Sequence, residues 1–202
     1  MKRSELDRVA VIGMSFGGST AGAFCLRDER CVAGINMDGL DIHFRATNQK
    51  MNAPFLMLHT DLNGFGRMIG APKDTRLFGF NEFAYTRFED AGTESDIVRL
   101  EVKGVLHLGF SDFTLFMRRP LRDLLLGSGN ADRIINIQND VVLNFLDQSF
   151  NGSGSEFPSV VLEKHAGHIV EMDNSAVRSW WTGLTSEQKD DIRTEIQVLS
   201  GN

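Results

Sequence analysis

The segment that decides the fold of this chain is Val9-Ala10-Val11-Ile12-Gly13-Met14-Ser15-Phe16-Gly17-Gly18. Its first four residues are apolar and three of them are β-branched, which is typical of a buried parallel strand. The run of small residues that follows, Ser19-Thr20-Ala21-Gly22-Ala23, predicts a helix. Ser15 therefore stands at the centre of G-x-S-x-G between a strand and a helix, the setting of a nucleophile elbow.

An elbow requires an unusual backbone conformation at Ser15. We expect a positive φ there, which is strained and raises the Oγ atom above the sheet. Gly13 and Gly17 flank the serine, and we expect a Cβ at either position to collide with the neighbouring strand or helix. The N–H of Phe16 lies at the start of the helix, where it would stabilise an oxyanion. The alternative interpretation is a glycine-rich turn with an incidental serine.

Further apolar runs predict three more strands, at residues 32–37, 54–59 and 96–102. The last run alternates, as a strand near the edge of a sheet does. Helical spacing is present at residues 81–91 and at about 136–149, and the second helix shows no wide polar face, so we expect it to pack directly against the sheet. Strands that alternate with helices predict an α/β protein with about four parallel strands flanked by helices.

The C-terminal quarter of the sequence has a different character. Residues 151–155 form a linker of glycine, serine and asparagine, and residues 160–162 are predicted as a short strand. The polar residues 179–199 predict a helix, with a capping sequence at residues 185–188.

Composition excludes several classes of function. The chain has 202 residues and a net charge of −6, without a basic stripe, so a nucleic acid is not an expected partner. No apolar run reaches the length of a membrane span, and the first eight residues contain no signal-peptide core. We expect the two cysteines, Cys25 and Cys31, to be reduced and half-buried, which favours the cytoplasm.

A nucleophilic serine needs a base to take its proton and an acid to orient the base. In hydrolases of this architecture the acid precedes the histidine along the chain. The two sets that satisfy this order are Ser15, Asp38 and His107, and Ser15, Asp61 and either His165 or His168. Position alone does not decide between them.

Three ordered motifs resemble the platelet-activating factor acetylhydrolases of the plasma and intracellular type II kind, and the bacterial esterases related to them. The motifs are GMSFGGSTA at 13–21, AGINMDG at 33–39 and VLHLGFSDF at 105–113. In that family the acid follows the strand after the elbow helix, and the histidine precedes a phenylalanine-and-aspartate signature. The resemblance implies that Ser15 is the nucleophile, Asp38 the acid and His107 the base, with the oxyanion held by the Phe16 N–H.

The resemblance covers about residues 8–150 and implies a partial α/β-hydrolase fold that lacks its N-terminal part. We expect residues 1–150 to be the C-terminal part of the hydrolase domain and residues 151–202 to be a linker and appendage. The second oxyanion N–H of this fold comes from before the elbow strand, where the sequence offers no candidate. Two explanations are open: the chain is a fragment or truncated product, or a homo-oligomer or a partner chain completes the sheet.

The implied reaction is hydrolysis of a carboxylic ester through an acyl-enzyme, without a cofactor. Short-chain soluble esters and acetylated phospholipids both fit as small-molecule or lipid substrates. Two alternatives remain open at this point: a non-catalytic hydrolase-like binding or assembly subunit, and an esterase of the dienelactone-hydrolase or polyester-cleaving kind.

Four other polar residues have less specific interpretations. Asp61 is expected to be a turn residue at the end of a strand. His165 and His168 lie three residues apart without a third ligand of suitable spacing, so we expect no metal there. Asp112 either orients the loop of His107 or is simply solvated.

Overall fold

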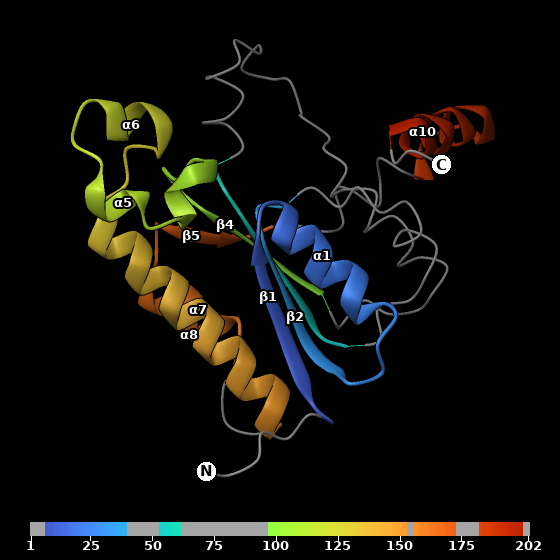
Figure 1. Ribbon diagram of the computed structural model, residues 1–202, viewed down its shortest axis with the longest axis horizontal. Coiled ribbons are helices and arrows are strands. Elements are labelled where there is room, and N and C mark those ends of the chain that lie inside the picture. Colours follow the sequence, from blue (N-terminus) through green and yellow to red (C-terminus); the bar gives the residue numbers. More distant parts are fainter. Residues whose placement is uncertain (1–6, 40–52, 62–96, 153–155, 173–181, 200–202) are drawn as a thin grey trace. The chain divides into compact units, whose positions relative to one another are not determined.

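The computed structural model describes residues 7–39, 53–61, 97–152, 156–172 and 182–199 (Figure 1). These residues form a mixed α/β structure with a mostly parallel sheet and flanking helices, as predicted. The helix predicted at residues 81–91 lies outside the described residues.

The chain divides into two compact units, which are described separately. The first unit comprises Met1–Phe55, Phe78–Ile97 and Asp173–Asn202, and the second comprises Leu56–Leu77 and Val98–Met172.

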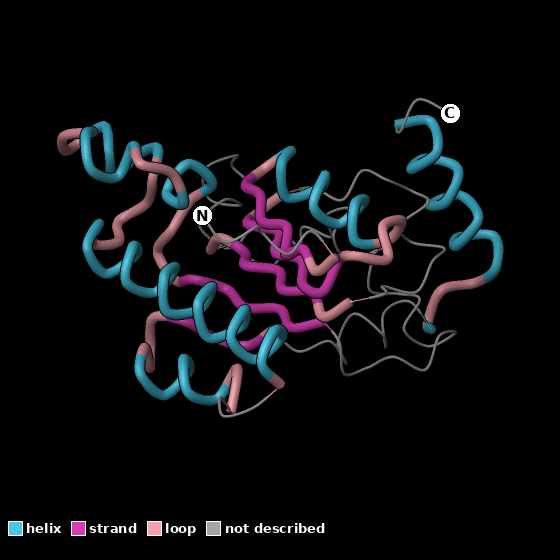
Figure 2. Tube along the Cα trace, turned by 60° about the horizontal axis from the view of Figure 1, so that its bottom comes forward, coloured by secondary structure: helices cyan, strands magenta, loops and turns pink. Residues whose placement is uncertain are grey.

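The strands are β1 (Val9–Met14), β2 (Cys31–Met37), β3 (Phe55–His59), β4 (Ile97–Val102) and β5 (Ile169–Glu171). Their order in the sheet is the order in the chain. Figure 2 shows the strands in magenta and the helices in cyan. β1 pairs with β2 in parallel, and β4 pairs with β5 in antiparallel fashion. The four strands expected from the sequence are confirmed, whereas β5 was not expected.

In the first unit, helix α1 (Phe16–Cys25) packs on β1 and β2 (Figure 1). Its buried residues are small and lie on one face of the helix: Gly18, Ser19, Ala21, Gly22 and Cys25. Small side chains allow the helix axis to approach the strands closely. This close approach fixes the turn between β1 and α1, where Ser15 lies.

Cys25 and Cys31 form a disulfide bond, so the expectation of two reduced, half-buried thiols is wrong. Cys25 is the last residue of α1 and Cys31 is the first of β2, and both side chains are buried. The turn between these elements brings the two Cα atoms to 5.1 Å, within the range that a disulfide requires. The bond ties the end of the elbow helix to the next strand.

In the second unit, β4 lies next to the last strand of the sheet, β5, so the strand predicted near the edge is confirmed. Arg99 and Glu101 are only 2% and 6% exposed. β5 covers the outer edge of β4: the N–H of Met172 donates to the Arg99 carbonyl, and the N–H of Lys103 donates to the His168 carbonyl. The polar residues of this alternating strand are therefore buried and do not lie on a free edge.

The long helix of the second unit is α7 (Ala131–Asn151). The Arg133 N–H donates to Asn130 Oδ1 before its first turn, and Gly152 caps its end. One face is buried and consists of Ile134, Ile137, Val141 and Phe145. The opposite side is polar or exposed, so the expectation of a helix without a wide polar face is wrong. The strand predicted at residues 160–162 is helix α8 (Ser159–Lys164) instead, because so short an apolar run carries no decisive period.

Helix α10 (Ser186–Leu199) belongs to the first unit. The N–H of Thr185 donates to Gln188 Oε1, and the Gln188 N–H donates to Thr185 Oγ1, so the predicted capping sequence is confirmed. Three short helices of the second unit were not expected: η2 (His107–Phe110), α5 (Phe113–Phe116) and α6 (Leu121–Leu125). No helix among the described residues is long and apolar enough to cross a bilayer.

Candidate active site

Ser15 occupies the turn between β1 and α1 with φ 54° and ψ −125°. The positive φ predicted for an elbow serine is therefore confirmed. The Ser15 N–H donates to the Met37 carbonyl at 2.9 Å, and the Ser15 carbonyl accepts from the N–H of Gly18 at 2.9 Å. A non-glycine residue in this conformation is strained by about 1–3 kcal/mol, and these bonds hold it there.

The glycine requirement of the elbow differs from the prediction at one position. A Cβ on Gly13 would lie 2.1 Å from the Gly17 carbonyl carbon, so the collision expected there is confirmed. A Cβ on Gly17 would meet nothing within 4 Å, so the collision expected there is wrong. The crowded neighbour is Gly18 instead, where a Cβ would lie 2.1 Å from Asn36 Oδ1.

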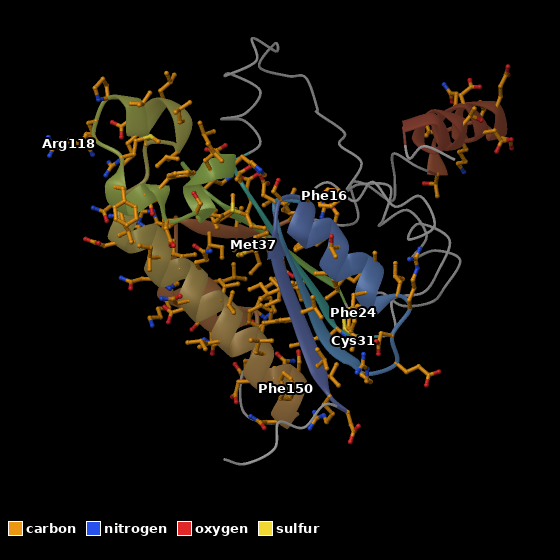
Figure 3. The ribbon with its side chains drawn as sticks, viewed as in Figure 1. Phe16, Phe24, Cys31, Met37, Arg118 and Phe150 are labelled. Atoms are coloured by element: carbon orange, nitrogen blue, oxygen red, sulfur yellow. A yellow bond between two sulfur atoms is a disulfide. The ribbon has the colours of Figure 1, made fainter. Side chains whose placement is uncertain are left out.

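Phe16 is the first residue of α1, and its side chain is 68% exposed (Figure 3). The N–H of the first helical residue has no acceptor within the helix itself. Such an N–H can stabilise negative charge at the helix N-terminus.

Asp38 follows β2 and is half-buried, with φ 52°. Within the described residues, Ser15 and Asp38 are the two non-glycine residues with positive φ. The turn of Asp38 lies against the elbow, because a Cβ on Gly39 would come within 2.0 Å of the Ser15 carbonyl oxygen. The first unit thus brings the predicted nucleophile and the predicted acid to the carboxyl ends of neighbouring parallel strands, where functional residues of α/β proteins gather.

His107 begins helix η2 in the second unit and is half-buried. The loop before it is held from two sides. The Leu106 N–H donates to the Leu126 carbonyl at 3.0 Å, and the Val105 carbonyl accepts from the Asp61 N–H at 2.8 Å. His107 therefore follows β4 on a loop whose main chain is fixed by segments distant in sequence.

Asp61 has a structural partner that sequence reasoning missed. Its Oδ2 atom accepts the N–H of Gly104 at 3.1 Å, in the turn between β4 and the His107 loop. Asp61 is thus a strand-end residue, as expected, that also supports the loop. Asp112 is exposed and precedes α5 without capping it through its side chain.

The two histidines of the alternative set contact helix α7. His165 Nε2 lies 2.7 Å from Asp140 Oδ2, and the Lys164 ammonium lies 2.8 Å from the same oxygen. The hydrogen bond from Lys164 lowers the pKa of Asp140, against the effect of burial and with help from His165. His168 Nδ1 lies 3.5 Å from an Arg133 guanidinium nitrogen.

His165 thus joins α8 to α7, whereas His168 lies directly before β5 and next to Arg133 of α7. Within the described part of the chain, no group of three His, Cys, Asp or Glu side chains is placed to hold a metal ion.

The profile of the family described as platelet-activating factor acetylhydrolase, isoform II, matches residues 1–157. Among solved structures, a ferulic acid esterase from Streptomyces cinnamoneus is similar with a TM-score of 0.54 and 22% sequence identity. The match covers 85% of this chain and 48% of that chain, so this chain spans about half the length of the esterase. No curated protein matches. The structural likeness shows the fold, and it confirms the predicted α/β-hydrolase class.

Proposed function

Because the chain belongs to the platelet-activating factor acetylhydrolase isoform II family, we propose that it hydrolyses carboxylic esters with Ser15 as the nucleophile. The observation that carries this proposal is the strained turn of Ser15 between β1 and α1. The turn of Asp38, which has a positive φ as well, packs directly on it. A turn that places a serine in this conformation costs free energy, and strain of this kind collects at functional sites.

In the proposed reaction, the Oγ atom of Ser15 attacks the ester carbonyl carbon while His107 takes the hydroxyl proton. Asp38 holds the imidazole in the required tautomer and stabilises the imidazolium that forms. The N–H of Phe16 donates to the oxyanion of the tetrahedral intermediate. His107 then returns the proton to the leaving alkoxide, which departs as the alcohol and leaves an acyl-enzyme on Ser15.

Deacylation repeats these steps with water. His107 takes a proton from the water molecule as its oxygen attacks the acyl carbon. Collapse of the second tetrahedral intermediate returns that proton to Ser15 Oγ and releases the carboxylic acid. The sequence of steps consumes one water and needs neither a metal nor a cofactor.

The proposed substrates are esters of short acyl chains, including acetylated phospholipids. The family assignment supports this class, and the exposed aromatic ring of Phe16 beside the nucleophile offers an apolar surface for an acyl group or an alcohol. We further propose that residues 1–150 form part of a hydrolase domain and residues 151–202 an appendage.

The redox state of Cys25 and Cys31 indicates the cellular compartment of the chain. The cytoplasmic prediction depended on the first residues, which contain no signal-peptide core, and on reduced thiols; the Cys25–Cys31 disulfide withdraws the second support. We propose an oxidising compartment instead, because disulfides form and persist there. Intact mass after alkylation, with and without reductant, measures the fraction of the chain that carries the bond in cells.

A fluorophosphonate probe and an aryl acetate test the proposed function. The wild-type chain is expected to be labelled at Ser15 and to hydrolyse the ester, whereas Ser15→Ala is expected to lose both properties and to keep its circular dichroism spectrum. The matched control is Ser149→Ala, which removes a hydroxyl from α7 that donates to the Phe145 carbonyl. Labelling that persists in Ser15→Ala, or is absent from the folded wild-type chain, contradicts the proposal.

A further inference from the structure

Asn36 is a buried polar residue at the end of β2, next to the turn that carries Asp38. Its side chain is only 2% exposed, in a strand whose other residues are apolar or glycine. A buried amide must form hydrogen bonds, because an unsatisfied polar group in the interior is costly. The bonds that Asn36 forms therefore indicate why it is there.

Both ends of the Asn36 amide bind the main chain of one residue, Gly39. The Gly39 N–H donates to Asn36 Oδ1 at 2.7 Å, and Asn36 Nδ2 donates to the Gly39 carbonyl at 3.0 Å. The side chain thus closes the turn Met37-Asp38-Gly39 from its inner side. Since Asp38 lies between the two bonded residues with φ 52°, the pair of bonds holds the chain in a conformation that an unrestrained aspartate seldom adopts.

The same amide also contacts the elbow. A Cβ on Gly18 would lie 2.1 Å from Asn36 Oδ1, so this side chain fills the space that glycine leaves in the first turn of α1. Gly39, in turn, packs on the carbonyl oxygen of Ser15. Asn36 therefore touches both the turn of the predicted acid and the helix that begins at the predicted nucleophile.

We propose that Asn36 is a positioning residue, which fixes the Asp38 turn against the Ser15 elbow so that the carboxylate is directed for catalysis. This inference rests on the proposed function, in which Asp38 is the acid of the triad. Asn36 touches neither substrate nor reacting atoms in this scheme, and it acts through the main chain of Gly39.

An amide is the side chain that this position requires. It offers one acceptor and one donor in a plane, and these match the N–H and the carbonyl of a single residue. An aspartate would keep the acceptor, but its second oxygen would face the Gly39 carbonyl without a proton to donate. An alanine would leave both Gly39 groups without their partner.

Displacement of a catalytic group by about 1 Å can cost roughly 10²-fold in rate. We therefore expect Asn36→Ala and Asn36→Asp to lower kcat on an aryl acetate by about 10- to 100-fold, with KM changed by less than about 3-fold. The KM is expected to hold because Asn36 does not contact the ester.

The experiment counts active serines before measuring turnover. Each variant is titrated with a fluorescent fluorophosphonate, and kcat is expressed per labelled Ser15. Loss of folded protein lowers the number of labelled serines but leaves kcat per labelled serine unchanged, whereas a misdirected acid lowers kcat itself and slows labelling. The matched control is Ile35→Val, which removes a methyl group from the neighbouring residue of β2, 0% exposed, and is expected to reduce stability without reducing kcat.

The outcomes separate this proposal from the proposed function. Failure of the folded wild-type chain to label at Ser15 contradicts the proposed function. Normal labelling of wild type, together with kcat per labelled serine within 2-fold of wild type in either folded Asn36 variant, overturns the positioning role. A loss of kcat that Ile35→Val reproduces also overturns it, and so does failure of both Asn36 variants to fold, since Asn36 would then be a core residue only.

Discussion

The region around Ser15 and the region around His107 are held in place in different ways. At the elbow, main chain packs on main chain: Gly13 against Gly17, and Gly39 against the carbonyl of Ser15. At the His107 loop, hydrogen bonds from distant segments fix the main chain, and the one from Gly104 to Asp61 spans 43 residues of sequence.

This difference decides how each region responds to substitution. Close-packed main chain cannot make room for an added Cβ without moving, so the elbow should tolerate almost no change at its crowded glycines. A loop held by separate hydrogen bonds loses one bond at a time, at a cost of about 1–3 kcal/mol for each buried group left unsatisfied. A single substitution at a crowded glycine of the elbow should therefore cost more stability than the loss of any one hydrogen bond of the loop.

The largest expected effect comes from removing the proposed acid or base. Asp38→Asn and His107→Ala should each lower kcat by about 10³-fold or more, because members of a triad act as a unit. An amide at Asp38 cannot hold the imidazole in the required tautomer. Steady-state hydrolysis of an aryl acetate, normalised to the amount of folded chain, measures the effect.

Variants of the alternative set test whether Asp38 is the acid and His107 the base. The alternative set is the triad if Asp61→Asn and His168→Ala each lower kcat by about 10³-fold while Asp38→Asn and His107→Ala keep the wild-type kcat. Asp61 and His168 would then act in catalysis in place of Asp38 and His107.

The second prediction compares two glycines of the elbow. Gly13→Ala should lower the free energy of unfolding by about 2–3 kcal/mol or more, because its Cβ would meet the Gly17 main chain at 2.1 Å. Gly17→Ala is the matched control: its Cβ meets nothing within 4 Å, and alanine is a better helix former by up to about 1 kcal/mol. Urea denaturation of both variants measures the difference, and equal destabilisation would contradict the packing described here.

The elbow was predictable from sequence because its geometry is local. A strand, a glycine pair around Ser15 and a helix of small residues determine it within a single short stretch, and the positive φ followed from that pattern. The packing of Asn36 against Gly18 and Gly39 could have been suspected from a lone polar residue in an apolar strand. Its actual partners depend on tertiary contacts that no local pattern contains.

Features that depend on long-range pairing were missed. β5 has only three residues, too few for a periodic signal, and it is a strand only because β4 offers a free edge. The disulfide needed the Cα distance across the turn from α1 to β2, which the spacing of the cysteines does not give.

The third prediction concerns the support of the His107 loop. Asp61→Ala removes the acceptor of the Gly104 N–H and should lower the free energy of unfolding by about 1–2 kcal/mol. Its kcat should fall by less than about 10-fold, since the loop keeps its main-chain bonds to Asp61 and Leu126. Asp61→Asn keeps an acceptor oxygen and should retain nearly the wild-type kcat; a loss on the scale of Asp38→Asn would contradict a supporting role.

The smallest expected effect is a pH dependence confined to the second unit, at the junction of α7 and α8. Lys164 and His165 lower the pKa of Asp140 below its ordinary value of 3.8. A carboxyl group whose pKa is lower in the folded chain stabilises the fold above the unfolded value, and this contribution disappears as pH falls through the folded value. Because Lys164 is largely exposed, the contribution should stay below about 1 kcal/mol.

Asp140→Asn should therefore lower the free energy of unfolding at pH 6, and its difference from wild type should shrink as the pH is lowered below 3.8. The control is Glu163→Gln on α8, which removes the same charge from an exposed residue and should show no such trend. Urea denaturation at pH 6 and pH 3 measures both differences. A difference for Asp140→Asn that does not change with pH would show that the carboxylate charge is not what joins the helices. The second unit would then depend on apolar packing, such as the contact between Phe145 and Phe157. Like the elbow, it would be held by packing more than by separate polar contacts.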